Sequence, residues 1–261
     1  MNKYIKNTLL TAFTAMLCAG CISNKAVKRE YNKDTTMTVI IGLEESKRYG
    51  KCVGSEIDVE KMSKLLAPYS SKQIVLFNWK ATRERVTEAL KEACQQDLAI
   101  IYYSGHGGSQ QQMNPVASDF VEPSGYDSFL CLYDAPLMDD EIWSIISNAK
   151  GRVILITDAC HSATMYRDAS FMNFEKQQKN IDEERASKPR ILAVGGCADT
   201  SYSYGGDDGG LMTNAILLAW RNHRTYKTVF NRVKKNPNVY RSQTVTTTMI
   251  GDSFEDYELF R

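Results

Sequence analysis

Two stretches of sequence decide the fold: Leu98–Gly108, which reads LAIIYYSGHGG, and Arg152–Ser162, which reads RVILITDACHS. Each contains a continuous apolar run near its start and ends in small and reactive side chains. An uninterrupted apolar run of this length is typical of a strand that is buried on both faces of a parallel sheet. In such sheets, sites form outside the carboxyl ends of the strands. Both motifs are therefore expected at the carboxyl edge of the sheet, where a functional site would form.

Apolar runs alternate with helical patterns on either side of these stretches. Further strands are predicted at residues 37–43, 73–77, 129–133, 190–194 and 244–250. Helices are predicted at residues 57–66, 82–94, 139–147 and 211–221, with Thr82 as the N-cap of the second. This alternation indicates an α/β fold with a mostly parallel sheet covered on both faces. Because no repeat or linker interrupts it, one folded domain is expected.

The composition of the 261 residues excludes several classes of protein. Hydrophobic residues make up 43% and charged residues 24%, which argues against disorder and against a coiled coil. The formal net charge is +1, so the basic excess of a nucleic-acid-binding protein is missing and no nucleic-acid partner is expected. Three histidines leave few candidates for a general base at neutral pH.

The N-terminus is predicted to be an export signal rather than part of the fold. Lys3 and Lys6 precede a short apolar run, Thr8–Leu17, which is too short to cross a bilayer core of ~30 Å. Ala19-Gly20-Cys21 resembles a bacterial lipobox, which predicts cleavage before Cys21 and lipidation of that cysteine. An ordinary signal peptide that is cut nearby is the alternative.

These features divide the chain into three parts. Residues 1–20 are expected to be a lipoprotein-type signal peptide, residues 21–36 a polar tether, and residues 37–261 the folded domain. The protein is accordingly expected in the cell envelope, attached to a bacterial membrane through its N-terminal lipid, or secreted.

A cysteine and a histidine follow the two buried strands. If those strands are neighbours, Cys160 and His106 face each other across one crevice. A thiolate nucleophile and an imidazole that moves protons are what nucleophilic acyl transfer needs. Gly107 and Gly108 let the backbone approach a substrate, and an N–H there can join that of Cys160 as an oxyanion hole.

Each of these residues also has an ordinary structural interpretation. A cysteine after a strand is most often a buried hydrophobic residue, and a histidine in a turn need not be catalytic. The presence of both motifs, each after a buried strand, favours the catalytic interpretation. His161 is expected to be structural and His223 to be solvated.

YYSGHGG and DACHS together resemble the signature of the caspase-like cysteine peptidases, specifically the metacaspase and bacterial caspase-domain branch. The resemblance runs in the correct order over about residues 37–220. It also rests on Asp58–Met62, Tyr126–Asp127, Leu130–Asp134, Asp139–Ile142, Gly196–Asp199 and Gly210–Thr213. The chain departs from the family at Ala163, where a glycine is usual, at Ile57, where an asparagine is usual, and in lacking the animal signature QAC[RQG]G.

The resemblance implies a fold and a reaction. The fold is a caspase-haemoglobinase-like three-layer α/β/α sandwich with a mostly parallel central sheet. The activity is that of a cysteine endopeptidase in which Cys160 is the nucleophile, His106 the general acid/base and Gly107 an oxyanion-hole donor. The alternative is a catalytically silent envelope lipoprotein that uses the same fold for binding or scaffolding.

The resemblance also implies a specificity pocket. Asp58 and Asp158 match acidic residues that line this pocket in metacaspases, Ser104 matches a small polar residue at its edge, and Asp199 matches a residue nearby. Two carboxylates select a cation, which implies protein or peptide substrates cleaved after Arg or Lys. Asp58 could instead be a helix-dipole partner, and Asp158 could cap the following turn.

No cofactor is expected, although calcium activation is possible. Asp127, Asp139 and Asp140 match positions that bind calcium in some metacaspases, and oxygen ligands suit that ion. Asp139 and Asp140 also begin a predicted helix, where acidic residues are favoured in any case. No metal-ligating residue is therefore assigned.

Two further features are left as predictions. The polar stretch at residues 167–188 contains Lys176, Lys179 and Arg185, and is a candidate for self-cleavage. The cysteines other than Cys18, Cys21 and Cys160 are predicted to be buried thiols, and their pairing is left open: Cys52, Cys94, Cys131 and Cys197.

Overall fold

A computed structural model describes residues 32–111, 126–163, 189–197, 203–221, 225–251 and 254. Within these residues the centre of the molecule is a six-stranded sheet of order β13-β10-β9-β5-β1-β4. The strands are β1 (Thr36–Gly42), β4 (Lys72–Phe77), β5 (Leu98–Ser104), β9 (Arg152–Asp158), β10 (Arg190–Gly195) and β13 (Thr246–Ile250). All pairs are parallel except β10 with β13. The prediction of a mostly parallel sheet is confirmed.

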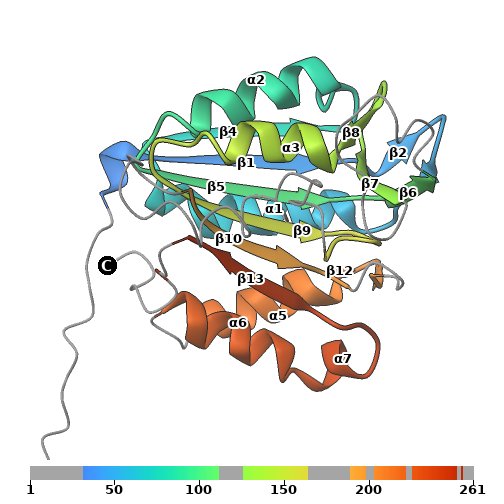
Figure 1. Cartoon of the computed structure of the whole chain (residues 1–261). Helices are drawn as coiled ribbons and strands as arrows, with labels where there is room; N and C mark the ends of the chain where they lie inside the picture. Colours follow the sequence, from blue (N-terminus) through green and yellow to red (C-terminus); the bar gives the residue numbers. More distant parts are fainter. Residues whose placement is uncertain are drawn as a thin grey trace, which may run out of the picture.

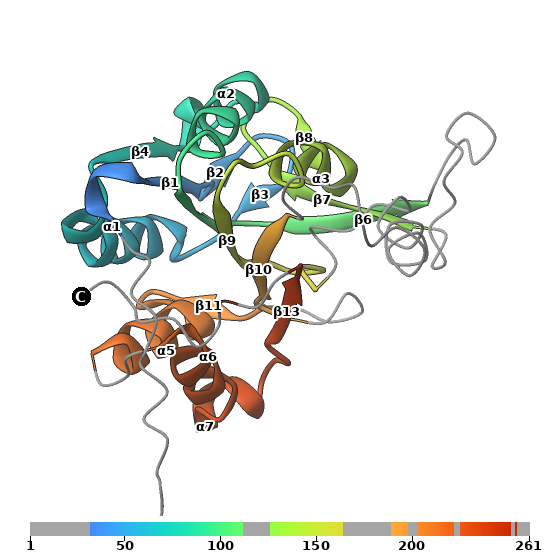
Figure 2. The ribbon, with the colours of Figure 1, turned by 60° about the vertical axis from the view of Figure 1, so that its left-hand side comes forward.

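Helices cover both faces of the sheet (Figures 1 and 2). One face carries α2 (Arg83–Ala93) and α3 (Asp139–Ile146). The other carries α1 (Ser55–Leu66), α5 (Leu211–Trp220), α6 (Tyr226–Lys234) and α7 (Pro237–Tyr240). Side chains alternate between the two layers, as the period of a strand requires. Ile101 and Tyr103 of β5 pack toward α2 and α3, whereas Ile100 and Tyr102 pack toward α1 and α5. The predicted three-layer α/β/α sandwich is confirmed.

Small strands gather at the carboxyl end of the sheet (Figure 1). They are β2 (Glu45–Ser46) with β3 (Gly50–Lys51), β6 (Gly107–Gln111) with β7 (Tyr126–Cys131) and β8 (Pro136–Met138), and β11 (Gly205–Gly206) with β12 (Gly209–Gly210). Short 3₁₀ turns complete the described elements: η1 (Lys33–Thr35), η2 (Ala67–Tyr69) and η3 (Asn78–Lys80). The small strands surround the edge of the sheet at which both sequence motifs end.

The predicted strands and helices are present, with bounds shifted by a few residues. Thr82 caps α2 as expected, because its side chain accepts a hydrogen bond from the Arg85 N–H at 3.4 Å. Helix α6 was not predicted from the sequence, although its buried residues follow the helical spacing: Tyr226, Val229, Phe230 and Val233. Of the small strands, only β7 was predicted, at residues 129–133. Most of the others have only two or three residues and show no period.

The register of the sheet aligns the site. Gly42, the last residue of β1, pairs with Ser104 of β5, and Ser104 pairs with Asp158 of β9. In the sheet, β4 lies on one side of β1, whereas β5 and β9 lie on its other side. A crevice at such a reversal of strand order is where open α/β sheets bind ligands.

No helix in the described part of the chain is long and apolar enough to cross a membrane. The predicted signal peptide, Cys21 and most of the tether lie outside the described residues, as do residues 167–188, Asp199 and His223.

Truncating the central strand will destabilise the protein far more than truncating the edge. Ile100 is 0% exposed in β5, and Ile100→Ala is expected to lower the free energy of unfolding by about 2–5 kcal/mol, because it leaves a cavity between packed layers. The control Val75→Ala, at a side chain 40% exposed on edge strand β4, should cost less than about 1 kcal/mol. Urea denaturation measures both, and equal losses would contradict this assignment of the core.

Candidate active site

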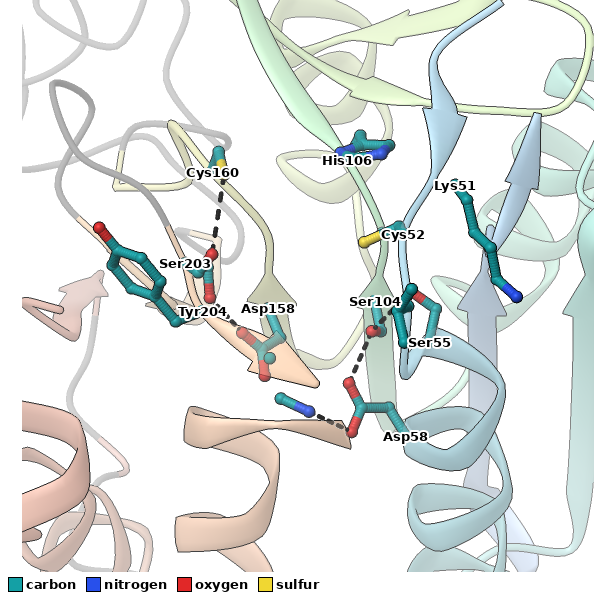
Figure 3. Close-up of a pocket in the computed structure, with 14 residues that line it drawn as sticks. Lys51, Cys52, Ser55, Asp58, Ser104, His106, Asp158, Cys160, Ser203 and Tyr204 are labelled. Carbon is teal, nitrogen blue, oxygen red and sulfur yellow. Dashed lines mark hydrogen bonds between the residues drawn. The ribbon is translucent and has the colours of Figure 1, made fainter. Parts of the chain in front are cut away.

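A pocket of about 270 Å³ opens at the carboxyl edge of the sheet (Figure 3). It brings together five of the residues singled out from the sequence: Asp58, Ser104, His106, Asp158 and Cys160. The other lining residues are Lys51, Cys52, Val53, Ser55, Gly105, Ser203, Tyr204, Gly205 and Gly210. The nucleophile candidate, the base candidate and both acidic residues therefore share one cavity.

Cys160 and His106 reach this pocket from neighbouring strands. Each lies two residues beyond the end of its strand, β9 for Cys160 and β5 for His106, and the two strands are paired in parallel. Both side chains are partly exposed. The expectation that they share one crevice is confirmed (Figure 3).

Gly107 lies directly against the backbone of Cys160. A Cβ atom at position 107 would stand 2.1 Å from the Cys160 carbonyl oxygen. Only glycine permits so close an approach. The start of β6 is thereby held beside the thiol-bearing turn, which is the neighbourhood that an oxyanion-hole donor would need.

The loop that carries His106 is fixed through its backbone. The Tyr103 hydroxyl lies 2.7 Å from the carbonyl oxygens of both His106 and Cys131, and the Cys131 N–H donates to the His106 carbonyl at 3.0 Å. In contrast, Nε2 of the His106 ring is buried and has no hydrogen-bond partner among the described residues. The loop is held while the ring keeps its capacity to exchange protons.

The turn after Cys160 has an unusual backbone. His161 has φ +53°, in the left-handed region, which bends the chain directly after the cysteine. Ser162 then accepts a hydrogen bond from the Cys197 N–H at 3.2 Å. His161 is not among the residues that line the pocket, in agreement with a structural role.

The two carboxylates at the pocket floor are buried and held by neutral donors. Asp58, 2% exposed, comes from the first turn of α1 and accepts hydrogen bonds at 2.8 Å from both the Gly210 N–H and the Ser104 hydroxyl. Asp158 accepts from the Ser203 hydroxyl at 2.5 Å and from Thr213 through its hydroxyl at 2.8 Å and its N–H at 3.1 Å.

Gly210 separates the two carboxylates. A Cβ atom there would stand 2.2 Å from Oδ2 of Asp158 and 3.0 Å from Oδ2 of Asp58. Both acids therefore face the same small volume at the end of hairpin β11–β12. A helix-dipole or capping role for either acid would not require this convergence.

Burial of two like charges shifts their titration. The pKa of Asp58 is raised to about 7, first by loss of solvent and next by the charge of Asp158. Burial also raises the pKa of Asp158. A cation in this pocket would offset both effects, so the arrangement favours a positively charged ligand.

Several residues that line or support the pocket were not predicted from the sequence. Ser203 and Thr213 hold Asp158, and Gln243 bridges the Tyr204 N–H (2.9 Å) and the Gly196 carbonyl (2.7 Å). The feature of the sequence that could have pointed to this part of the pocket is the Gly209-Gly210 pair, which directly precedes α5. No motif in the sequence marks Cys52 as a pocket residue.

The structure describes the carboxylate surroundings of two of the three acidic residues considered for calcium, Asp139 and Asp127. Asp139 is buried at the start of α3 and accepts hydrogen bonds from the N–H groups of Ser128 (3.1 Å) and Asp140 (3.0 Å). Oδ1 of Asp127 is buried without a hydrogen-bond partner in the described part of the chain. Among the residues that the structure describes, no group of three or more His, Cys, Asp or Glu side chains could hold a metal ion. All five described cysteines are free thiols. Cys94, Cys131 and Cys197 are buried as predicted, whereas the prediction was wrong for Cys52, which is partly exposed and lines the pocket.

Comparisons with known proteins agree with the fold described above. The family described as "Caspase domain" matches residues 35–249. Metacaspase-4 of Arabidopsis thaliana is 23% identical over 170 residues, which are 59% of this chain and 40% of that relative. The match thus spans less than half of the relative's length.

Two solved structures share the fold. Protein GSU0716 from Geobacter sulfurreducens is 25% identical with a TM-score of 0.64, covering 84% of this chain and 94% of that one. Caspase-1 from Spodoptera frugiperda is 14% identical with a TM-score of 0.57, covering 84% and 88%, and shows a likeness of fold alone. Since the domain match extends over most of the chain and the architecture agrees with it, this chain belongs to the caspase-like peptidase family.

Proposed function

We propose that this protein is a cysteine endopeptidase that cleaves proteins or peptides after Arg or Lys. The observation that carries the proposal is the shared pocket, in which a thiol and an imidazole stand above two buried carboxylates (Figure 3). The thiol and imidazole supply acyl-transfer chemistry, and the carboxylates supply the preference for a cation. The family membership supports peptide substrates.

In the proposed reaction, the basic side chain of the substrate enters between Asp58 and Asp158. The Cys160 thiolate attacks the carbonyl carbon, and backbone N–H groups of Gly107 and Cys160 stabilise the oxyanion. The C–N bond breaks as His106 gives its proton to the leaving amine, which leaves a thioester on Cys160. His106 then takes a proton from water, the hydroxide attacks the thioester, and the acid product and the thiol are released.

We further propose that the N-terminal signal directs the protein to the cell envelope, where Cys21 would carry the lipid. The support for this is the lipobox-like sequence before Cys21. Self-cleavage within residues 167–188 and activation by calcium stay predictions from the sequence.

Loss of either reactive side chain should abolish peptidase activity. Cys160→Ala and His106→Ala are each expected to lower kcat for a fluorogenic Arg or Lys peptide by at least about 10³-fold, because the nucleophile or the proton carrier is gone. Cys94→Ala is the matched control, since Cys94 is a buried thiol with a pKa raised to about 12 by burial, remote from the pocket. Equal signal from wild type and Cys160→Ala would favour the catalytically silent module instead.

Neutralising the pocket floor should reduce the preference for basic residues. Asp58→Asn and Asp158→Asn are each expected to lower kcat/KM for an Arg substrate by about 10–100-fold, the worth of one hydrogen-bonded charge partner. Asp207→Asn, in the exposed turn of hairpin β11–β12, changes the same net charge outside the pocket and should leave kcat/KM within about two-fold. If all three variants lost activity equally, long-range charge rather than the pocket would set the preference.

Binding of a basic ligand should weaken in acid as Asp58 takes up a proton. With its pKa raised to about 7, Asp58 is mostly protonated at pH 5.5, so the Kd of an Arg peptide for Cys160→Ala should rise by up to about 30-fold relative to pH 8. The Cys160→Ala background removes titration of the nucleophile. Adding Asp58→Asn should flatten this pH dependence, and an unchanged slope would exclude Asp58 as its source.

The raised pKa of Asp58 also affects stability, and here acid favours the folded state although it weakens binding of a basic ligand. Between the ordinary carboxyl pKa and about 7, the folded state binds more protons at Asp58 than the unfolded state does. Its contribution to the free energy of unfolding therefore falls as the pH rises through this window. Asp58→Asn should reduce that decline in urea denaturation curves measured between pH 4.5 and pH 7.5 (about the window of the raised pKa).

A further inference from the structure

The pocket contains a second thiol for which the proposed peptide hydrolysis has no use. Cys52 lies between β3 and α1 and lines the same pocket as Cys160. Its sulfur faces the cavity (Figure 3). Its backbone is held at both ends, because its N–H donates to the Glu44 carbonyl at 2.8 Å and its carbonyl accepts from the Ser55 N–H at 3.3 Å.

Cys52 differs from the other cysteines that accompany Cys160. Among the described cysteines, Cys52 and Cys160 are partly exposed, whereas Cys94, Cys131 and Cys197 are buried. Cys131 interacts electrostatically with both pocket thiols but is 2% exposed and does not line the pocket. The exposed pair is therefore the one that a small oxidant in the pocket would meet.

The two pocket thiols lie within electrostatic reach of each other. Burial raises the pKa of Cys52, and the charges of Cys160, Asp158 and Asp58 raise it further. A side-chain hydrogen bond with Ser55 lowers the pKa of Cys52 in part, but the net shift is upward and keeps this thiol protonated. Oxidation of Cys160 to an uncharged species would remove one of these repulsions and make Cys52 easier to ionise.

Two glycines with positive φ flank the segment that carries Cys52. Gly50 and Gly54 have φ +80° and +98°, a backbone region that glycine occupies without strain. These turns present the three residues between them, Cys52 included, at the edge of the pocket. A disulfide requires the Cα atoms of Cys52 and Cys160 to come within about 4.4–6.8 Å of each other.

We propose that Cys52 is a resolving thiol that forms a reversible disulfide with Cys160 after a hydroperoxide has oxidised Cys160. The disulfide would close the pocket above the carboxylates, switch off the peptidase and protect the nucleophile from irreversible oxidation. The regulatory part of this proposal rests on the proposed peptidase function, whereas the disulfide itself does not.

The chemistry takes two steps. The Cys160 thiolate attacks one oxygen of the hydroperoxide, the O–O bond breaks, and the sulfur loses two electrons to become a sulfenic acid while the other oxygen leaves and takes up a proton. The Cys52 sulfur, on losing its proton, attacks that sulfenic sulfur. The S–O bond breaks, the S–S bond forms, and the departing oxygen leaves as water with the proton from Cys52.

Oxidation of the full-length protein by hydrogen peroxide tests this directly. Wild type, Cys52→Ser and Cys131→Ala are treated, blocked with an alkylating agent, digested without reductant and examined by mass spectrometry. In wild type and Cys131→Ala, a peptide linking Cys52 to Cys160 is expected. In Cys52→Ser, Cys160 is expected as sulfinic or sulfonic acid, because no thiol resolves its sulfenic acid.

Activity provides the second readout, with each variant compared to its own untreated sample. Dithiothreitol should restore several-fold more activity to oxidised wild type and Cys131→Ala than to Cys52→Ser. A linkage of Cys160 to Cys131, or the same Cys160 oxidation products with and without Cys52, would overturn the proposal. The linked peptide is detected without any substrate, so failure of the peptidase assay is distinguishable from failure of the disulfide.

Discussion

The parallel pairing of β5 with β9 is the constraint on which the rest of the site depends. Hydrogen bonds of that ladder set Ser104 opposite Asp158, and each strand then continues two residues further to His106 and Cys160. Because the carboxyl ends of parallel strands meet at one edge, four chemically different groups arrive together without any long loop to place them. A shift of the register by one residue would turn each side chain to the opposite face and separate them.

Among the residues that the structure describes, the hydrogen-bond partners of the two buried acids at the pocket floor include no cationic side chain. Asp58 and Asp158 are satisfied by hydroxyl and backbone N–H donors, which stabilise a carboxylate but leave its charge in place. Lys61 lowers the pKa of Asp58, yet its ammonium group donates to the Asp208 carbonyl and to Asn214. The folded state thus retains a repulsion between the two buried carboxylates, and uptake of a proton by Asp58 relieves it.

The sequence predicts the fold, and the proximity of His106 and Cys160 in one pocket, because both have local signals. Buried parallel strands are continuous apolar runs, and the motifs ending in His106 and Cys160 follow such runs directly. The residues of the site that the sequence did not predict are close to it only in the folded structure, and not along the chain. Ser203, Thr213 and Gly210 reach the carboxylates from elements more than 40 residues away in the chain, and no periodicity marks them. Two-residue strands such as β11 and β12 carry too few side chains to show an alternation.

Two adjacent tyrosines of β5 connect the halves of the site. Tyr103 points to one face of the sheet, where its hydroxyl holds the His106 loop. Tyr102 points to the other face, where its hydroxyl lies 2.6 Å from that of Thr213. Because Thr213 uses its own hydroxyl proton on Asp158, Tyr102 is the donor in that pair. One strand therefore positions the His106 loop on one side and, through Thr213, the Asp158 carboxylate on the other. The rigidity of a packed core is thereby transmitted to both, and the sheet itself fixes the separation between the His106 loop and the carboxylates.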